Sequence, residues 1–255
     1  MLSIDQYAYS NALKNIHPME KFWFALMTLG ICLVSQSWQF HMIVIVTMTI
    51  LTVGRAKIPL KFYGKLAVVP IFFLVLGVLT ITFVITKESS VVLYGVSIGD
   101  YVIGVSAQGL RQVGVIFFRA YAAVSCLYFL ALTTPMVDLI WVLKKLKTPT
   151  ILTELMMIIY RFIFVLLETA SLMYISQDCR LGYISHRQSY HSLGKLVSNL
   201  FLKAFYRAKE LFIALSTRGY TGDILVLEDA YCLSVKNIIC ITLIEILFIL
   251  MAILV

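Results

Sequence analysis

Residues 22–53 read FWFALMTLGICLVSQSWQFHMIVIVTMTILTV, and this stretch decides the fold class of the chain. It is apolar except for a break at residues 36–39, QSWQ. At ~1.5 Å per helical residue the stretch is too long for one crossing of a hydrocarbon core ~30 Å thick. It therefore predicts two short membrane helices joined by a tight turn, with a single kinked helix as the alternative.

Composition supports a membrane protein. Hydrophobic residues make up 61% of the 255 residues, charged residues make up 13%, and the mean hydropathy is +0.93. Soluble domains carry roughly 25% charged residues. The net charge of +8 does not indicate nucleic-acid binding, because lysine and arginine collect in particular loops, as the positive-inside rule expects of cytoplasmic segments.

The remaining apolar runs complete an all-α, polytopic architecture of about five spans. The loop over residues 55–65 is basic and has no acid, so it is expected in the cytoplasm together with the N-terminus. The loop over residues 87–109 is expected outside, and so is the C-terminus. The predicted spans after the first pair are 66–86, 111–132 and 237–255. The predicted regions are 1–132 with four spans, a cytoplasmic coupling domain over 133–235, and a last span in 236–255.

The coupling domain contains long helices with mixed faces. Residues 151–175 are oily enough to cross a membrane, yet basic residues flank both ends, which favours a helix lying at the cytoplasmic face. Glu154, Arg161 and Glu168 recur every seven residues and form one polar stripe. Within residues 193–215, apolar residues recur at helical spacing and polar residues take the opposite face, which predicts an amphipathic helix.

Two similar sequences end these helices. One reads Cys179-Arg180-Leu181-Gly182-Tyr183 and the other reads Thr217-Arg218-Gly219-Tyr220. Two cationic helix ends held apart by a helix of fixed length would suit a partner that comes in two copies. The alternative is two unrelated helix ends, because arginine is common in a last turn and glycine commonly follows it.

These motifs and the N-terminal residues resemble the transmembrane T component of energy-coupling factor transporters, of the CbiQ type found in cobalt importers. The N-terminal residues that carry the resemblance are Ile4-Asp5-Gln6-Tyr7-Ala8-Tyr9, Asn11, Leu13, His17-Pro18 and Glu20-Lys21. The family's arginine triplets usually read Ala-Arg-Gly. Here Cys179 and Thr217 stand where alanine is common, and Leu181 follows the first arginine.

The resemblance implies a function and partners. Two triplets, Cys179-Arg180-Leu181 and Thr217-Arg218-Gly219, would dock into two ATP-binding-cassette subunits. A metal-binding membrane subunit and a small accessory membrane subunit would complete a cobalt or nickel importer in the lipid bilayer. A T component for vitamins and a conventional permease of the same transporter class are the alternatives.

Other candidate sites are few. Glu245 is the one acid in the last span, and we expect it to pair with Arg119 or Arg111 in a structural or a functional ion pair. The histidines show no spacing typical of a metal site, so neither a metal nor another cofactor is expected in this chain; they are His17, His41, His186 and His191. The chain has no phosphate-binding loop or nucleophile elbow, and its spans supply too few catalytic groups for an intramembrane enzyme.

Overall fold

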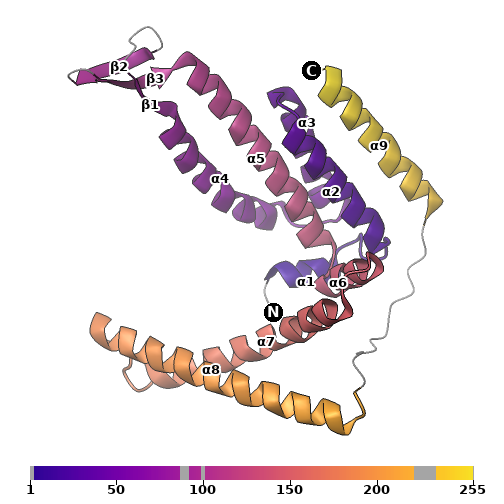
Figure 1. The fold of residues 1–255 in the computed structure, drawn as a ribbon, viewed down its shortest axis with the longest axis vertical. Coiled ribbons are helices and arrows are strands. Elements are labelled where there is room, and N and C mark those ends of the chain that lie inside the picture. The colour runs from indigo at the N-terminus through magenta and orange to yellow at the C-terminus, as the bar shows by residue number, and fades with distance from the viewer. Residues whose placement is uncertain (1–2, 87–91, 99–100, 221–233, 255) are drawn as a thin grey trace. The chain divides into compact units, whose positions relative to one another are not determined.

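The computed structural model describes residues 3–86, 92–98, 101–220 and 234–254, and it divides the chain into two compact units. We call residues 2–139 and 230–255 the bundle, and residues 140–229 the hairpin unit. The elements are labelled in Figure 1.

The bundle begins with a short helix and the predicted pair of membrane helices. Helix α1 covers Ser3–Ser10, α2 covers Pro18–Val34 and α3 covers Trp38–Thr49, and α3 continues into a π-helical turn, η1, over Ile50–Arg55. The break between α2 and α3 confirms the predicted turn. The chain reverses there, because Ala56, after η1, accepts a backbone hydrogen bond from Ala12, just before α2.

Two further helices are joined by a small sheet. Helix α4 covers Leu60–Thr82 and α5 covers Ala107–Thr133. The strands between them are β1 (Phe83–Thr86), β2 (Val92–Ile98) and β3 (Tyr101–Ser106), in the antiparallel order β1-β3-β2. Sequence analysis predicted only a loop here. The rest of the architecture is helical, as predicted.

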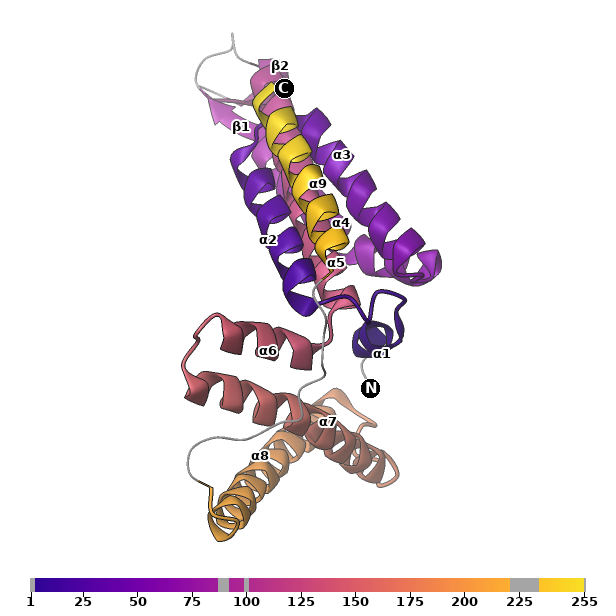
Figure 2. The ribbon, with the colours of Figure 1, turned by 90° about the vertical axis from the view of Figure 1, so that its right-hand side faces the viewer.

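Helix α5 lies at the centre of the bundle and packs against α1, α2, α3 and α4, while α9 (Val235–Leu254) packs on α2 and α3. Figures 1 and 2 show this arrangement. Aromatic rings join the helices, with Phe24 of α2 against Phe129 of α5 at 5.6 Å and Phe40 of α3 against Phe248 of α9 at 6.0 Å. Burial of such rings contributes a large share of core stability.

A side chain of α5 supplies a hydrogen bond that a proline removes from α4. Pro70 lies inside α4, and because proline has no N–H it leaves the carbonyl four residues earlier without its helical donor. That carbonyl belongs to Leu66, and the Tyr128 hydroxyl of α5 donates to it at 3.1 Å. The proline therefore fits inside a membrane helix without an unpaired carbonyl.

The hairpin unit contains the long helices that the sequence predicts between residues 133 and 235. Helix α6 covers Met136–Lys145 and passes from the bundle into this unit, α7 covers Thr150–Asp178, and α8 covers His186–Thr217 and packs on α7. The amphipathic helix predicted from residue 193 thus begins seven residues earlier, at His186.

Among the residues that the structure describes, five helical stretches are long and apolar enough to cross a membrane: Trp38–Arg55, Leu60–Thr80, Val113–Thr133, Thr150–Asp178 and Val235–Ala252. The predicted number is confirmed, but the members differ. Helix α2, at 17 residues, is not among them, whereas α7 is. Length and composition allow α7 to cross, and the basic residues at both of its ends favour the membrane surface.

Candidate functional site

The first arginine motif forms a tight turn at the end of α7. The Gly182 N–H donates to the Gln177 carbonyl at 2.9 Å, and the Leu181 N–H donates to the Asp178 carbonyl at 2.9 Å. This pair of bonds is the Schellman motif. Arg180 directly precedes the left-handed residue of the motif, which is Leu181, with φ 60°.

The second arginine motif forms the same turn at the end of α8. The Tyr220 N–H donates to the Leu215 carbonyl at 3.1 Å, and the Gly219 N–H donates to the Ser216 carbonyl at 3.2 Å. Arg218 directly precedes the left-handed residue here too, which is Gly219, with φ 73°. The two turns therefore have the same backbone hydrogen bonds, with Leu181 in the place of Gly219, and the two arginines occupy equivalent positions.

Both turns are accessible. The predicted docking residues are all exposed, namely Cys179, Arg180, Leu181, Thr217, Arg218 and Gly219. Within the described residues, neither the Arg180 nor the Arg218 guanidinium has a hydrogen-bond or ion-pair partner. The 32 residues of α8 separate the turns, which corresponds to ~48 Å along the helix. Two cationic ends are thus presented at a fixed spacing.

A hydrogen-bond network fixes the first turn against α8. The Gln177 side chain accepts from the Tyr183 hydroxyl at 2.7 Å and donates to the Ser192 carbonyl at 3.1 Å. The Ser192 hydroxyl in turn donates to the Gly182 carbonyl at 2.8 Å. The Tyr174 and Tyr183 rings stack at 4.6 Å between centroids.

A longer-range contact attaches the second turn to α7. The Tyr220 hydroxyl donates to a carboxylate oxygen of Glu154, near the start of α7, at 2.5 Å. Each motif therefore uses the tyrosine that follows its glycine to attach to α7. Sequence analysis noted this repeat of glycine and tyrosine but assigned no role to the tyrosines.

A buried polar junction lies at the end of α5, and sequence analysis assigned it no role. Asn11 and Lys21 are 8% and 3% exposed. The Asn11 amide donates to the Leu132 carbonyl at 3.2 Å, and the Lys21 ammonium donates to the Thr133 carbonyl at 3.0 Å. These carbonyls end α5, where a cation also meets the negative end of the helix dipole.

Charge at this junction is partly balanced. Burial lowers the pKa of Lys21 to about 8, and the carboxylates of Asp138 and Glu20 oppose that shift. The Glu20 carboxylate accepts from the Ser234 N–H at 3.2 Å, directly before α9. The junction thus connects the start of α2 with the end of α5 and the start of α9. Its signal in the sequence is the group of polar residues between Asn11 and Lys21.

The predicted ion pair of Glu245 with Arg119 is wrong. Glu245 accepts from the Thr28 hydroxyl at 2.8 Å, whereas Arg119 donates to the Ser35 carbonyl at 3.0 Å. Thr28 and Ser35 are seven residues apart on α2, which corresponds to ~10 Å along its axis. Glu245 and Arg119 therefore lie at different levels of the bundle. The side chain of Arg111, the other predicted partner, lies outside the described residues.

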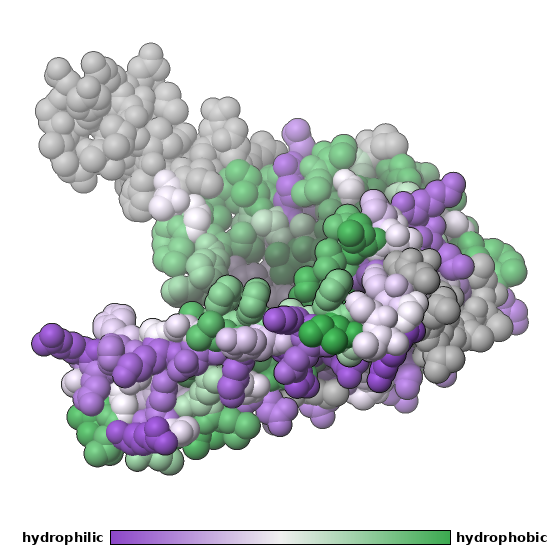
Figure 3. All heavy atoms as spheres, turned by 60° about the horizontal axis from the view of Figure 1, so that its bottom comes forward, coloured by the Kyte–Doolittle hydropathy of each residue, from purple (hydrophilic) through white to green (hydrophobic). Residues whose placement is uncertain are grey.

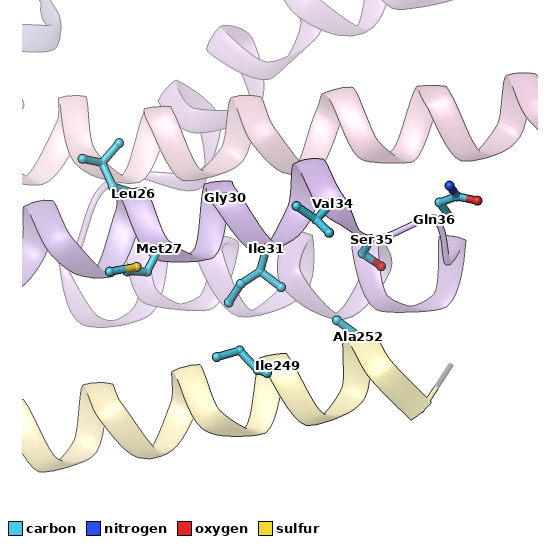
Figure 4. A pocket seen from close by; sticks show the side chains of 9 residues that line it. All are labelled: Leu26, Met27, Gly30, Ile31, Val34, Ser35, Gln36, Ile249 and Ala252. Carbon is cyan, nitrogen blue, oxygen red and sulfur yellow. The ribbon is translucent and has the colours of Figure 1, made fainter.

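An apolar groove of about 570 Å³ lies between α2 and α9. Figure 4 shows Ile31 of α2 and Ile249 of α9 pointing toward each other across it. Its lining is almost wholly aliphatic, with Ser35 and Gln36 as the polar members at one end. Such a lining suits lipid or another membrane helix, and it includes no histidine, cysteine or acidic side chain among the described residues.

Histidines are placed apart from one another. His17 caps α2 by accepting from the Met19 N–H at 3.2 Å, and His41 is fully buried in α3. His186 and His191 are exposed at the start of α8. Among the described residues, no group of three or more histidine, cysteine or acidic side chains is placed to hold a metal ion.

Comparison with known proteins identifies relatives along nearly the whole chain. Residues 9–226 match the CbiQ family, described as "Cobalt transport protein". "Uncharacterized protein MJ1089" of Methanocaldococcus jannaschii is 34% identical over 249 residues, which cover 98% of this chain and 92% of the relative. "Cobalt transport protein CbiQ" of Salmonella typhimurium is 31% identical over 88% of this chain and 99% of its own length. "Energy-coupling factor transporter transmembrane protein EcfT" of Listeria innocua is 27% identical over 82% and 81% of the two chains.

Proposed function

The chain belongs to the CbiQ family of cobalt transport proteins, and from that premise we propose that it couples two ATPase subunits to a metal-binding membrane subunit in an importer for cobalt or nickel. It is a multi-pass transmembrane component of an energy-coupling factor type of transporter. The coupling role, the partners and the metal are the proposed part. The chain itself would be non-catalytic, because ATP hydrolysis would reside in its partners.

The observation that carries this proposal is the equivalence of the two arginine turns. Both Arg180 and Arg218 directly precede the left-handed residue of a Schellman motif, both are exposed, and neither guanidinium has a partner among the described residues. A guanidinium is always charged and donates in a planar fork to carboxylates or carbonyls, so two equivalent copies suit two equivalent partner grooves.

The proposed mechanism follows from the way both turns are attached within the hairpin unit. Both turns attach to α7, through Tyr183 and Gln177 at one end and through Tyr220 and Glu154 at the other. Two ATPase subunits that close on ATP would each hold one turn and move the helix pair as a body. That movement would reach the membrane spans and the subunit that holds the metal ion.

The docking test uses single arginine variants in the assembled complex. Loss of a docking arginine costs ~2 kcal/mol or more at a desolvated contact, or about 30-fold in affinity. We expect Arg180→Ala and Arg218→Ala each to insert in the membrane but to lose co-purifying ATPase subunits and coupled uptake of cobalt. Arg207→Ala is the matched control, because Arg207 is exposed on α8 away from both turns. Normal ATPase recovery with both variants would refute the docking role.

The proposal also places α7 and the N-terminus on the cytoplasmic side. Cys179 is exposed at the first turn, whereas Cys32 and Cys126 are buried in the bundle. A variant that keeps only Cys179 should react with a membrane-impermeant maleimide in inside-out vesicles and not in right-side-out vesicles. Labelling from the outside alone would mean that α7 crosses the membrane.

A further inference from the structure

A cleft of about 900 Å³ lies between α7 and α8, and it begins at the first arginine turn. Its basic lining residues are Arg180, Lys195 and Lys203, with His191 beside them. No aspartate or glutamate is among the described residues that line it. An uninterrupted set of cations in a concave surface attracts a partner of opposite charge.

The cleft has regular geometry along α8. Lys195, Asn199 and Lys203 recur every four residues and so lie on one face of the helix. The two lysines are ~12 Å apart along the axis, and Arg180 lies at the end of α7 that borders the same cleft. The hydrogen bonds from Gln177 and Ser192 fix its closed end. The cations are therefore held on a rigid frame.

The other face of α8 is apolar and exposed. Val197, Phe201 and Phe205 are 64%, 70% and 60% exposed and also recur every four residues. Phe201 and Lys203 are two residues apart, so they point in directions ~200° apart around the helix axis. Figure 3 shows hydrophilic and hydrophobic areas side by side on the surface. An amphipathic helix at a membrane turns its apolar face toward the lipid or membrane proteins, so the basic cleft faces the aqueous side.

We propose that this cleft receives an acidic segment of the ATPase subunit that docks at Arg180, with Lys195 and Lys203 paired to its carboxylates. The inference rests on the proposed docking role of Arg180 and adds the chemistry of the partner. An acidic phospholipid is the less favoured occupant, because its chains would have to lie on the opposite side of α8 from the cleft. A cationic metal ion would be repelled.

The test compares two double variants of the lysines in the full chain, each purified with its partner subunits. Lys195→Glu with Lys203→Glu should lower ATPase recovery at least tenfold at 50 mM salt, and Lys195→Gln with Lys203→Gln should lower it less and weaken its dependence on salt. Arg207→Glu with Lys209→Glu is the control of equal charge change, because both residues are exposed on α8 outside the cleft lining. Amide exchange along α7 and α8 verifies that the helices remain folded.

The outcomes separate the two proposals. If Arg180→Ala releases the ATPase while both lysine pairs retain it, docking stands and the cleft proposal is overturned. If Arg180→Ala and Arg218→Ala also both retain it, the proposed function fails first. Equal loss in the Arg207 and Lys209 control would indicate a general charge effect and overturn the cleft proposal. The cleft proposal would also be overturned if the lysine variants no longer bound phosphatidylglycerol vesicles but still retained the ATPase.

Discussion

Gly182 gives the sharpest test of the first arginine turn. A Cβ atom at this position would lie 2.8 Å from the Gln177 carbonyl oxygen and 2.9 Å from the Ser192 hydroxyl oxygen. The Ser192 hydroxyl can rotate, but it would lose its 2.8 Å bond to the Gly182 carbonyl. The Gln177 carbonyl cannot move freely, because it accepts backbone bonds from both Arg180 and Gly182. Gly182→Ala must therefore open the turn.

The expected cost follows from this geometry. Overpacking of a tight contact costs about 1–3 kcal/mol, and a central value of ~2 kcal/mol corresponds to about a 30-fold change in an opening equilibrium. The amides of Leu181 and Gly182 close the turn, so their hydrogen exchange should become about 30-fold faster. Peptide-level mass spectrometry over residues 179–185 measures this.

Gly194→Ala is the matched control. Gly194 lies within α8, and among the described residues no atom other than the neighbouring backbone of the same helix lies within 4 Å of the position that a Cβ would occupy there. Replacement of a helical glycine by alanine stabilises a helix by roughly 0.5–1 kcal/mol, so exchange in α8 should slow. Unchanged exchange in the Gly182→Ala turn would refute the packing argument. An open turn with full ATPase recovery would show that docking does not depend on the turn that holds Arg180.

Three further predictions concern the turns and the junction. Tyr220→Phe removes the hydroxyl that donates to Glu154 and should raise amide exchange at the end of α8 about fivefold, since a typical hydrogen bond contributes ~1 kcal/mol; equal exchange in both proteins would mean that the bond does not hold the turn. Leu181→Gly relieves a left-handed conformation that costs a residue with a side chain roughly 1–2 kcal/mol, so amide exchange in the first turn should slow. ATPase recovery should fall at the same time, and unchanged recovery would show that the Leu181 side chain makes no contact with the ATPase. Lys21 has its pKa lowered by burial to about 8, so the folded state holds fewer protons than the unfolded state between pH 8 and about 10.5. The advantage of the natural protein over Lys21→Met in thermal unfolding should therefore grow across that window, and a constant difference would contradict the shift.

The helical framework could be predicted because it follows from local patterns. The break at residues 36–39 interrupts an apolar run that is too long for one span, and α2 and α3 end and begin there. The arginine turns could be predicted because helix ends depend on a few neighbouring residues. Hydropathy also identified α7 as long and apolar, and its flanking charges gave the argument against a crossing.

Contacts between distant segments could not be predicted in the same way. The pairing of Glu245 with Arg119 was expected from charge alone, but the level of each side chain along the bundle depends on helix packing, which places Glu245 beside Thr28. The strands between α4 and α5 were missed because strand pairing depends on register between segments, and glycine-rich stretches indicate turns just as well. The role of Lys21 depends on a carbonyl of Thr133, 112 residues away.

The two arginine turns share one backbone geometry but are attached to the helix pair at different places. Several bonds hold the first turn against α8, whereas the second is held to α7 by the bond between Tyr220 and Glu154. If two closing ATPases pull on both turns, as proposed, the bond between Tyr220 and Glu154 would help α7 and α8 to turn as one body. A rigid pair would pass the movement into α6, which begins three residues after Thr133, the residue whose carbonyl accepts from Lys21. Under the proposed coupling role, the contacts of Tyr220 and Lys21 would therefore serve the same motion, although the two residues lie in different units of the chain.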